Sequence, residues 1–405
     1  MTMTGIAGRW GEKVRSDCRV EVEPRAKGGV DLEVHSKVER LYGESIRKTC
    51  LGVLKSLGVK NARVKIEDTG ALEFALAARL ETAVKRARLA QVRESLPEPG
   101  PGLIASSRRE RFRRSRLYLP GNEPKYFTNA ALHEPDGVIL DLEDSVAPSE
   151  KDAARLLVRN ALRTVDFKDA ERMVRINQGE MGFEDLEAVI PQNVHVILIP
   201  KVESPQQVKE VDERAEALRR KAGLESPVML MPIIESALGC FKALEIASAS
   251  PNVVALTIGL EDYTADIGAA RTSEGKESLW ARQVVVNAAR AAGVTPIDTV
   301  FSDVGDMEGL KAAALEAKGL GFEGKGCIHP RQVPVVNRAF APAQEDIEKA
   351  ARIVTAFEQA EREGAGVVSL GSKMIDPPIV KRALRTVEMA EDLGLLPENW
   401  RKNNR

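Results

Sequence analysis

The chain has 405 residues, too many for one ordinary domain, and this length fits one large domain together with a small one. A formal net charge of −1 argues against a nucleic-acid-binding protein, because no basic excess is present to neutralise phosphates. No apolar run approaches the roughly 20 residues that span a bilayer, so we expect no membrane partner. The four cysteines are widely spaced, which predicts a cytoplasmic protein without disulfides or zinc.

Residues 1–92 predict a small α+β domain. Apolar and polar residues alternate over 18–35 around a turn at Lys27-Gly28-Gly29, and this pattern predicts a β-hairpin. The other elements expected in this domain are a helix over 38–57, a strand over 64–66 and a helix over 72–90.

A segment rich in proline and glycine follows at 96–102. It predicts neither a helix nor a central strand, because proline lacks an N–H donor and glycine costs entropy on ordering. We interpret residues 93–110 as an interdomain linker. A run of arginines then extends from Arg108 to Arg116, and it fits two interpretations: a solvated segment that leads into the next domain, or an anion-binding segment.

From residue 111 onward, short apolar stretches alternate with helical stretches rich in Ala, Leu, Glu, Arg and Lys. Strands buried on both faces are continuous apolar runs, and their alternation with helices predicts a parallel sheet. The eight stretches are RLYLP at 116–120, GVILDL at 137–142, RMVRIN at 172–177, HVILIP at 195–200, VMLMPII at 228–234, VVALTI at 253–258, PIDTVF at 296–301 and GKGCIH at 324–329.

Eight such units within residues 111–340 predict a (β/α)₈ TIM barrel. A doubly wound sheet is the alternative, although no GxGxxG motif follows the first strand. Residues 341–405 predict a C-terminal helical extension, with a turn at 370–372 and a last helix that opens at Pro377.

Polar side chains gather where the predicted strands end. In a TIM barrel the C-terminal ends of the strands form one mouth, and active sites are built there. The strand-end residues are Asp141, Glu143, Asp144, Arg175, Asn177, Lys201, Glu203, Glu235, Glu261, Asp262, Ser302, Asp303 and His329. We therefore expect the active site at this mouth.

The acidic members of this set predict a metal site. Crowded carboxylates repel one another unless a cation lies among them. Oxygen ligands without His or Cys favour Mg²⁺ over zinc, and Glu235 and Asp262, on adjacent strands, are the simplest ligand pair. Some of the other acids could instead cap helices or pair with lysines.

Several longer motifs lie along the second part of the chain. They are the run from Arg113 to Arg155 that contains LDLEDSVAP, VRIN at 174–177, IPKVES at 199–204, PIIESALG at 232–239, GLEDYTADIGA at 259–269, GFEGKGCIHPRQ at 321–332 and MIDPPIV at 374–380. These motifs resemble those of the citrate lyase beta-subunit-like proteins of the HpcH/HpaI aldolase/citrate lyase family. They occur in family order and cover nearly all of residues 111–395.

The front domain is similar to the acyl carrier (gamma) subunit of citrate lyase, through CRVEVEP, DLEVHSKVERLYGESIRKT and DTGALEFALAARLETAVKRA. In that subunit a serine in a Glu-Ser-Ser-Asp or Glu-Ser-Gly-Asp context carries a phosphoribosyl-dephospho-coenzyme A arm. The matching stretch here, Val14-Arg15-Ser16-Asp17-Cys18, is one residue shorter and has Arg in place of Glu. Ser16 is the candidate attachment site. The alternative is an unmodified domain kept for packing or assembly.

The resemblance implies a Mg²⁺-dependent carbon–carbon lyase that cleaves a 3-hydroxy-3-carboxyacyl thioester into an acyl thioester and a 2-oxo acid. A citryl thioester, which yields oxaloacetate, is favoured. The resemblance assigns Mg²⁺ to Glu235 and Asp262, enolate stabilisation to Arg175, and protonation of the enolate carbon to Asp376. Since Asp376 lies far beyond the barrel strands, it would arrive on a C-terminal lid from a neighbouring subunit, which implies a homo-oligomer, trimeric in the relatives.

Other residues are expected to support this chemistry. Arg175 and Glu235 would also contact the substrate, and Gly121 could bind its pantetheine or phosphate part. Asp141, Glu143, Asp144 and Lys201 are expected around the metal ligands rather than among them.

Two other functions remain open. The chain could be a citramalyl-CoA or malyl-CoA lyase that acts on free coenzyme A thioesters. It could also be an assembly or carrier subunit of low activity, whose front domain docks an acyl-transferase partner of the citrate lyase alpha type.

Overall fold

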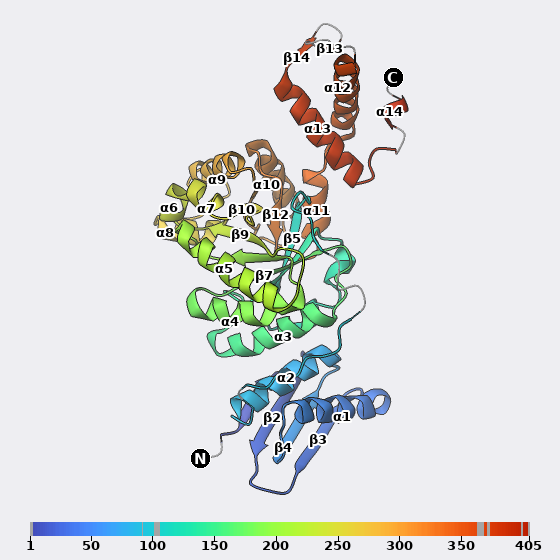
Figure 1. Cartoon of the computed structure of the whole chain (residues 1–405), viewed down its shortest axis with the longest axis vertical. Coiled ribbons are helices and arrows are strands. Elements are labelled where there is room, and N and C mark those ends of the chain that lie inside the picture. The colour runs from blue at the N-terminus through green and yellow to red at the C-terminus, as the bar shows by residue number, and fades with distance from the viewer. Residues whose placement is uncertain are drawn as a thin grey trace. The chain divides into compact units, whose positions relative to one another are not determined.

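The computed structural model describes residues 3–90, 92–100, 106–362, 368–370, 373–397 and 400–403. The chain divides into two compact units, Met1–Pro334 and Val335–Arg405. The first unit holds a four-stranded sheet and an eight-stranded sheet, and the second is mainly helical (Figure 1). The domain boundaries expected near residues 92, 110 and 340 stay predictions. The front sheet and the barrel belong to one compact unit, and the chain divides only between Pro334 and Val335.

The front region is a four-stranded sheet with the strand order β1-β2-β4-β3 and two helices. Its elements are β1 Gly5–Gly8, β2 Cys18–Pro24, β3 Val30–Ser36, α1 Glu39–Ser56, β4 Ala62–Asp68 and α2 Glu73–Arg86. The predicted hairpin between the second and third strands is wrong, because β4 lies between them, antiparallel to β2 and parallel to β3. The side chains of Ala62, Val64 and Ile66 are fully buried, so β4 takes the central position, and α1 supplies the crossover that a parallel pair requires.

The eight-stranded sheet is a TIM barrel, as predicted. Its strands are β5 Ser115–Pro120, β6 Gly137–Asp141, β7 Glu171–Arg175, β8 Val196–Ile199, β9 Met229–Ile234, β10 Ala255–Ile258, β11 Thr295–Ile297 and β12 Lys325–Cys327. They follow the order β11-β10-β9-β8-β7-β6-β5-β12, and every pair is parallel. A bridge between Asp298 and Lys325 joins β11 to β12, so the sheet is nearly closed.

Helices alternate with the barrel strands along the chain. They are α3 Lys151–Thr164, α4 Gly179–Val189, α5 Pro205–Lys221, α6 Ala237–Phe241, α7 Ala243–Ala247, α8 Leu260–Asp266, α9 Leu279–Ala291, α10 Met307–Leu320 and α11 Gln332–Phe340, with 3₁₀ turns at η1 Pro124–Tyr126, η2 Ala130–His133, η3 Pro148–Glu150 and η4 Ile190–Gln192. Apolar side chains from the inner faces of the strands fill the barrel, among them Ile139, Met173 and Leu198. None of the described helices combines the length and apolar character that crossing a membrane requires.

The front sheet is attached to the barrel through α2, which packs against α3. Arg159 on α3 forms an ion pair with Glu81 on α2, with a distance of 2.7 Å between Nη2 and Oε2, and both side chains are buried. Arg79, also on α2, donates to the backbone carbonyl of Asn122, in the segment that follows β5, at 2.9 Å. The front region is therefore fixed to the barrel by buried charged side chains.

The second unit contains α12 Gln344–Arg362, β13 Val368–Leu370, β14 Lys373–Ile375, α13 Pro377–Asp392 and α14 Trp400–Asn403. Apolar side chains of α12 and α13 form its core together with Trp400. Two residues of the turn predicted at 370–372, Gly371 and Ser372, lie outside the described residues, and β13 pairs with β14 across this position. A helix does begin at Pro377, but it is not the last one, because α14 follows it.

Candidate active site

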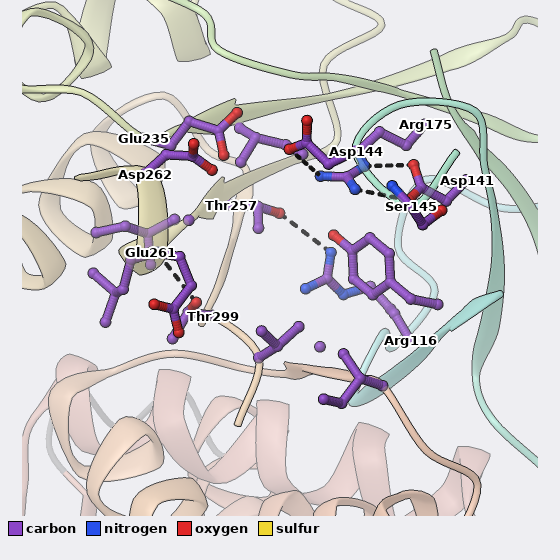
Figure 2. A pocket seen from close by; sticks show the side chains of 18 of the residues that line it. Arg116, Asp141, Asp144, Ser145, Arg175, Glu235, Thr257, Glu261, Asp262 and Thr299 are labelled. Atoms are coloured by element: carbon purple, nitrogen blue, oxygen red, sulfur yellow. Dashed lines mark hydrogen bonds and ion pairs between the residues drawn. The ribbon is translucent and has the colours of Figure 1, made fainter. Parts of the chain in front are cut away.

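A cavity of about 340 Å³ lies at the C-terminal ends of the barrel strands (Figure 2). Its walls come from β5, β6, β7, β9, β10 and β12 and from the segments that follow β6, β9, β10, β11 and β12. The structure brings six of the predicted strand-end side chains into this lining: Asp141, Asp144, Arg175, Glu235, Glu261 and Asp262. They gather here because the strands are parallel and their C-terminal ends share one mouth.

Glu235 and Asp262 come from neighbouring strands of this mouth. Glu235 directly follows β9, and Asp262 lies in the first turn of α8, after β10. The backbone N–H of Lys201 donates to Oε1 of Glu235 at 2.6 Å and orients the carboxylate. Within the described part of the chain, neither carboxylate has a cationic side chain at ion-pair distance. Two carboxylates without a cationic partner in one cavity are an arrangement that attracts a cation.

The carboxylate of Glu235 is only 5% exposed. Burial raises its pKa to about 8, and the negative charges of Glu143 and Asp262 act in the same direction. The Glu235 carboxyl group therefore keeps its proton near neutral pH unless a bound cation takes the place of that proton.

Gly259 makes room for the Glu235 carboxylate. A Cβ atom at Gly259 would lie 2.5 Å from Oε2 of Glu235. The φ of Gly259 is −109°, which any residue adopts, so the close approach and not the backbone conformation requires glycine. A side chain at this position would displace the carboxylate.

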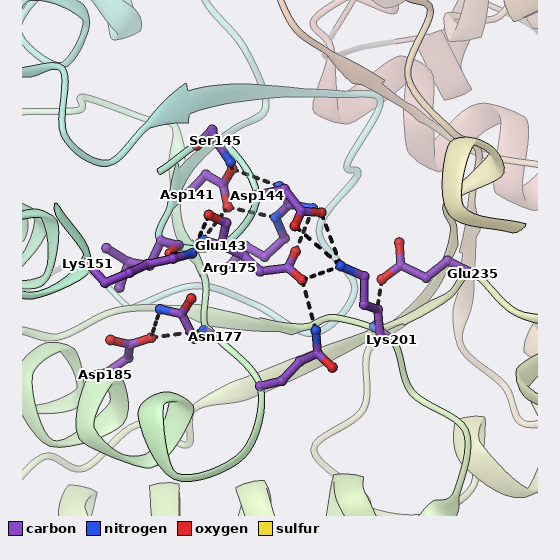
Figure 3. A network of polar contacts seen from close by, with 12 residues as sticks. Asp141, Glu143, Asp144, Ser145, Lys151, Arg175, Asn177, Asp185, Lys201 and Glu235 are labelled. Carbon is purple, nitrogen blue, oxygen red and sulfur yellow. Dashed lines mark hydrogen bonds and ion pairs between the residues drawn. The ribbon is translucent and has the colours of Figure 1, made fainter. Parts of the chain in front are cut away.

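Arg175, the last residue of β7, is held in place by acidic side chains (Figure 3). Its Nε and Nη2 donate to the two carboxylate oxygens of Asp141, each at 2.7 Å, and its Nη1 lies 3.0 Å from Oε2 of Glu143. Burial alone would raise the pKa of Asp141, but the hydrogen bonds and charge of Arg175 hold that pKa below its ordinary value. Arg175 is thus a permanent, oriented cation that lines the cavity.

Lys201 connects this network to the metal-ligand candidates. Its Nζ donates to Glu143 at 2.9 Å and to Asp144 at 3.3 Å, while its backbone N–H binds Glu235. Burial alone would lower the pKa of Lys201, but the hydrogen bond to Glu143 raises it overall. The residues expected around the metal ligands therefore form one connected network beside Glu235, as Figure 3 shows.

The cavity lining also contains Tyr118 and Thr257, which the sequence analysis did not single out, and Arg116, which it named only as part of the arginine run. The interpretation of the arginine run as a solvated segment is wrong for Arg113 and Arg116, whose side chains are fully buried. Arg113 pairs with Glu171 at 2.7 Å. The sequence pattern that could have identified Arg116 and Tyr118 as cavity residues is the alternation within β5, which places both on one face of the strand.

Gly121 is not part of the cavity lining. Its backbone N–H donates to the carbonyl oxygen of Asp141 at 2.8 Å, and a Cβ atom here would lie 2.5 Å from that oxygen. The close approach of two backbone segments therefore explains this glycine. Its predicted contact with substrate stays a prediction.

Three of the remaining strand-end residues have local structural roles. Oδ1 of Asp303 accepts hydrogen bonds from the backbone N–H groups of Gly305 and Asp306, and Nδ1 of His329 accepts one from Arg331. Asn177 donates to Asp185 at 2.7 Å. These contacts cap turns or fix loops around the mouth.

Ser16 lies in a turn of the front region with φ 54°, and its side chain is half-buried. Its neighbour Asp17 is buried and accepts two hydrogen bonds from Arg79, at 2.9 and 3.0 Å. Asp376 belongs to the second unit, where it precedes the first turn of α13 and its side chain is exposed. The predicted roles of Ser16 and Asp376 stay predictions.

Comparison with known proteins places this site in a family. Residues 114–330 match the HpcH/HpaI aldolase/citrate lyase family, and residues 8–87 match a family described as malonate decarboxylase delta subunit (MdcD). The chain belongs to the HpcH/HpaI aldolase/citrate lyase family and carries an acyl-carrier-like domain in front. Both resemblances found in the sequence are thereby confirmed.

Among its relatives is citrate lyase subunit beta of Haemophilus influenzae, which is 44% identical over 69% of this chain and 98% of the relative. Human mitochondrial citramalyl-CoA lyase is 35% identical over 76% of this chain and 95% of the relative. A solved structure of the protein CitE from Mycobacterium tuberculosis in complex with magnesium, acetoacetate and coenzyme A has a TM-score of 0.55 and 32% identity, and it covers 70% of this chain and 100% of that one. This chain is thus a lyase of the same family.

Proposed function

We propose that this lyase depends on Mg²⁺ and cleaves a 3-hydroxy-3-carboxyacyl thioester, in particular a citryl thioester, into an acetyl thioester and oxaloacetate. The carrying observation is that Glu235 and Asp262 share one cavity with Arg175 and have no cationic partner among the described side chains. The 44% identity with a citrate lyase beta subunit supports the citryl substrate.

The residues present fit Mg²⁺. The described residues contain no cluster of three or more His, Cys, Asp or Glu side chains placed to hold an ion. Glu235 and Asp262 share the cavity and would hold the ion, with water and substrate oxygens as its other ligands, which is the usual coordination of Mg²⁺ in enzymes. When bound, it would act as a Lewis acid on the hydroxyl and carboxylate of the half that becomes the oxo acid.

Arg175 would stabilise the charge that develops when the carbon–carbon bond breaks. The enolate forms on the thioester carbonyl, and an oriented guanidinium donates to its oxygen. Asp141 occupies Nε and one N–H of Nη2, which leaves other N–H groups of Arg175 for this acceptor. Asp376 would then protonate the enolate carbon. It would be delivered from the second unit of a neighbouring copy in a homo-oligomer, such as a trimer.

Two further parts of the proposal concern partners. Ser16 would carry a phosphoribosyl-dephospho-coenzyme A arm, so that the substrate arrives on the front domain, and an acyl-transferase subunit of the alpha type would load it. Cleavage of free citramalyl-CoA or malyl-CoA is the alternative, supported by the 35% identity with citramalyl-CoA lyase.

The deciding experiment is turnover of citryl-, citramalyl- and malyl-CoA by the purified protein, with Mg²⁺ and then with EDTA, followed through the 2-oxo acid released. We expect Mg²⁺-dependent release of oxaloacetate from citryl-CoA. Faster release of pyruvate from citramalyl-CoA, or of glyoxylate from malyl-CoA, would show that the preferred substrate is that thioester and not citryl-CoA. A second measurement tests whether Ser16 carries the arm. It compares the intact mass of the protein with that of its Ser16→Ala variant, before and after mixing with an alpha-type subunit.

The proposed metal site predicts a pH dependence of stability. Unfolded Glu235 loses its proton near 4.5, but folded Glu235 keeps it up to a pKa of about 8. The folded metal-free protein therefore binds more protons between these values. Its free energy of unfolding is highest below pH 4.5 and falls, by on the order of 5 kcal/mol in total, as the pH rises through 8. Mg²⁺ should remove this loss, since it binds the ionised carboxylate.

Urea unfolding at several pH values, with and without Mg²⁺, measures this effect. The Glu235→Gln variant is the matched control, because it cannot titrate at this position. Equal pH slopes for the wild type and Glu235→Gln, without metal, would contradict the prediction.

A further inference from the structure

Arg116 is a buried cation for which the folded chain supplies no counter-charge. Its side chain is 0% exposed. Nη1 contacts Sδ of Met231 at 3.0 Å and donates to Oγ1 of Thr257 at 3.3 Å, Nη2 reaches the backbone carbonyl of Asp298 at 3.5 Å, and Nε has no partner. Within the described part of the chain, its guanidinium has no carboxylate at ion-pair distance.

The acidic groups around Arg116 are already neutralised. The buried carboxylate of Asp298 binds Lys325 at 2.7 Å and Arg282 at 3.2 Å. Burial raises the pKa of the Cys327 thiol to about 12, so that this neighbour is uncharged. An unpaired charge in a protein interior is destabilising, and a chain that retains one usually pairs it with a ligand.

Arg116 belongs to the wall of the active-site cavity. Arg116 and Thr257 line the same cavity as Glu235, Asp262 and Arg175. Figure 2 shows Arg116 and Thr257 in the same view as the carboxylates of Glu235 and Asp262. A molecule bound to a metal at those carboxylates would thus lie in the cavity that Arg116 also lines.

We propose that Arg116 binds a second carboxylate on the 2-oxo acid half of the substrate and so selects a dicarboxylic oxo acid. This inference rests on the proposed lyase function. The oxo group and the adjacent carboxylate would chelate the metal, which leaves the rest of the carbon chain to reach Arg116. That remainder ends in a carboxylate in oxaloacetate, is a methyl group in pyruvate and a hydrogen atom in glyoxylate. A charged partner for Arg116 exists only in the first.

The test is binding of oxaloacetate and of pyruvate to the Mg²⁺-loaded full chain, measured by calorimetry with freshly prepared oxaloacetate. A charge-assisted pair predicts that the wild type prefers oxaloacetate by about 30-fold. Arg116→Met should abolish this preference and leave the affinity for pyruvate within about threefold of wild type. Arg109→Met, which removes an exposed arginine of the same run, is the matched control and should retain the preference.

Thermal unfolding without ligand separates a binding role from a structural one. Arg116→Met should melt at the same temperature as the wild type or higher, because the variant removes an unpaired buried charge. An unchanged oxaloacetate preference, an equal loss of both acids, or a lower melting temperature would each overturn the inference. If the wild type binds Mg²⁺ but neither acid, the lyase proposal itself fails, and the subsite fails with it.

Discussion

Arg175→Met is expected to lower kcat/KM for the preferred thioester by at least about 10³-fold, because the oxyanion would lose its principal cationic donor. The loss should fall mainly on kcat, since charge on the thioester oxygen is largest in the transition state. Arg175→Lys keeps the charge but loses the two parallel hydrogen bonds to Asp141, so it should recover only a small part of the rate.

Stability must be measured alongside these rates. Arg175→Met leaves the buried Asp141 without its main partner, which costs about 3–5 kcal/mol when one member of a buried pair is removed. The double variant Arg175→Met/Asp141→Asn removes both charges and should recover most of this stability without recovering turnover. If the double variant regains both, Arg175 has a structural role and the catalytic assignment is wrong.

The second large effect is expected at the attachment of the front domain. Arg79→Met should lower the free energy of unfolding by about 3–5 kcal/mol, because Asp17 would remain buried without its cation. The same change removes the hydrogen bond from Arg79 to the carbonyl of Asn122, which holds the front domain to the segment after β5. Urea unfolding, followed by circular dichroism, measures the loss.

Arg19→Met is the matched control for this measurement. Arg19 pairs with Glu67 at 3.0 Å in the same front sheet, but its side chain is partly exposed, and such pairs contribute less than about 1 kcal/mol. Equal losses for Arg79→Met and Arg19→Met would show that the buried pair does not anchor the domain. A loss of unfolding free energy confined to Arg79→Met would support the view that the pair of Arg79 with Asp17, the neighbour of Ser16, helps to fix the front domain to the barrel.

Much of the fold was predictable because it depends on local patterns. The sequence located all eight barrel strands, since strands buried on both faces are continuous apolar runs such as GVILDL at 137–142. The match is poorest for PIDTVF at 296–301, which shares only two residues with β11 Thr295–Ile297. The gathering of Asp141, Arg175 and Glu235 at one mouth followed from the barrel itself, because parallel strands that end at one side bring their last residues together.

The pairing of strands was not predictable in the same way. Alternation over 18–35 correctly indicated two strands, but alternation specifies which face of a strand is buried and not which strand lies next to it. The apolar side chains of β4, at Ala62, Val64 and Ile66, come later in the chain and take the central place between β2 and β3. Which strand pairs with β2 therefore depends on the burial of residues that lie far apart in the sequence.

The sequence by itself determined the family, the barrel and the acidic mouth, because each of these follows from residue order and periodicity. Only the tertiary structure decided which charges are paired. It gave Arg113 the partner Glu171 and Asp298 the partners Arg282 and Lys325, and it left Arg116 buried beside neutral groups. Ion pairs join residues far apart in the chain, so a run of arginines cannot reveal which one the fold leaves without a counter-charge.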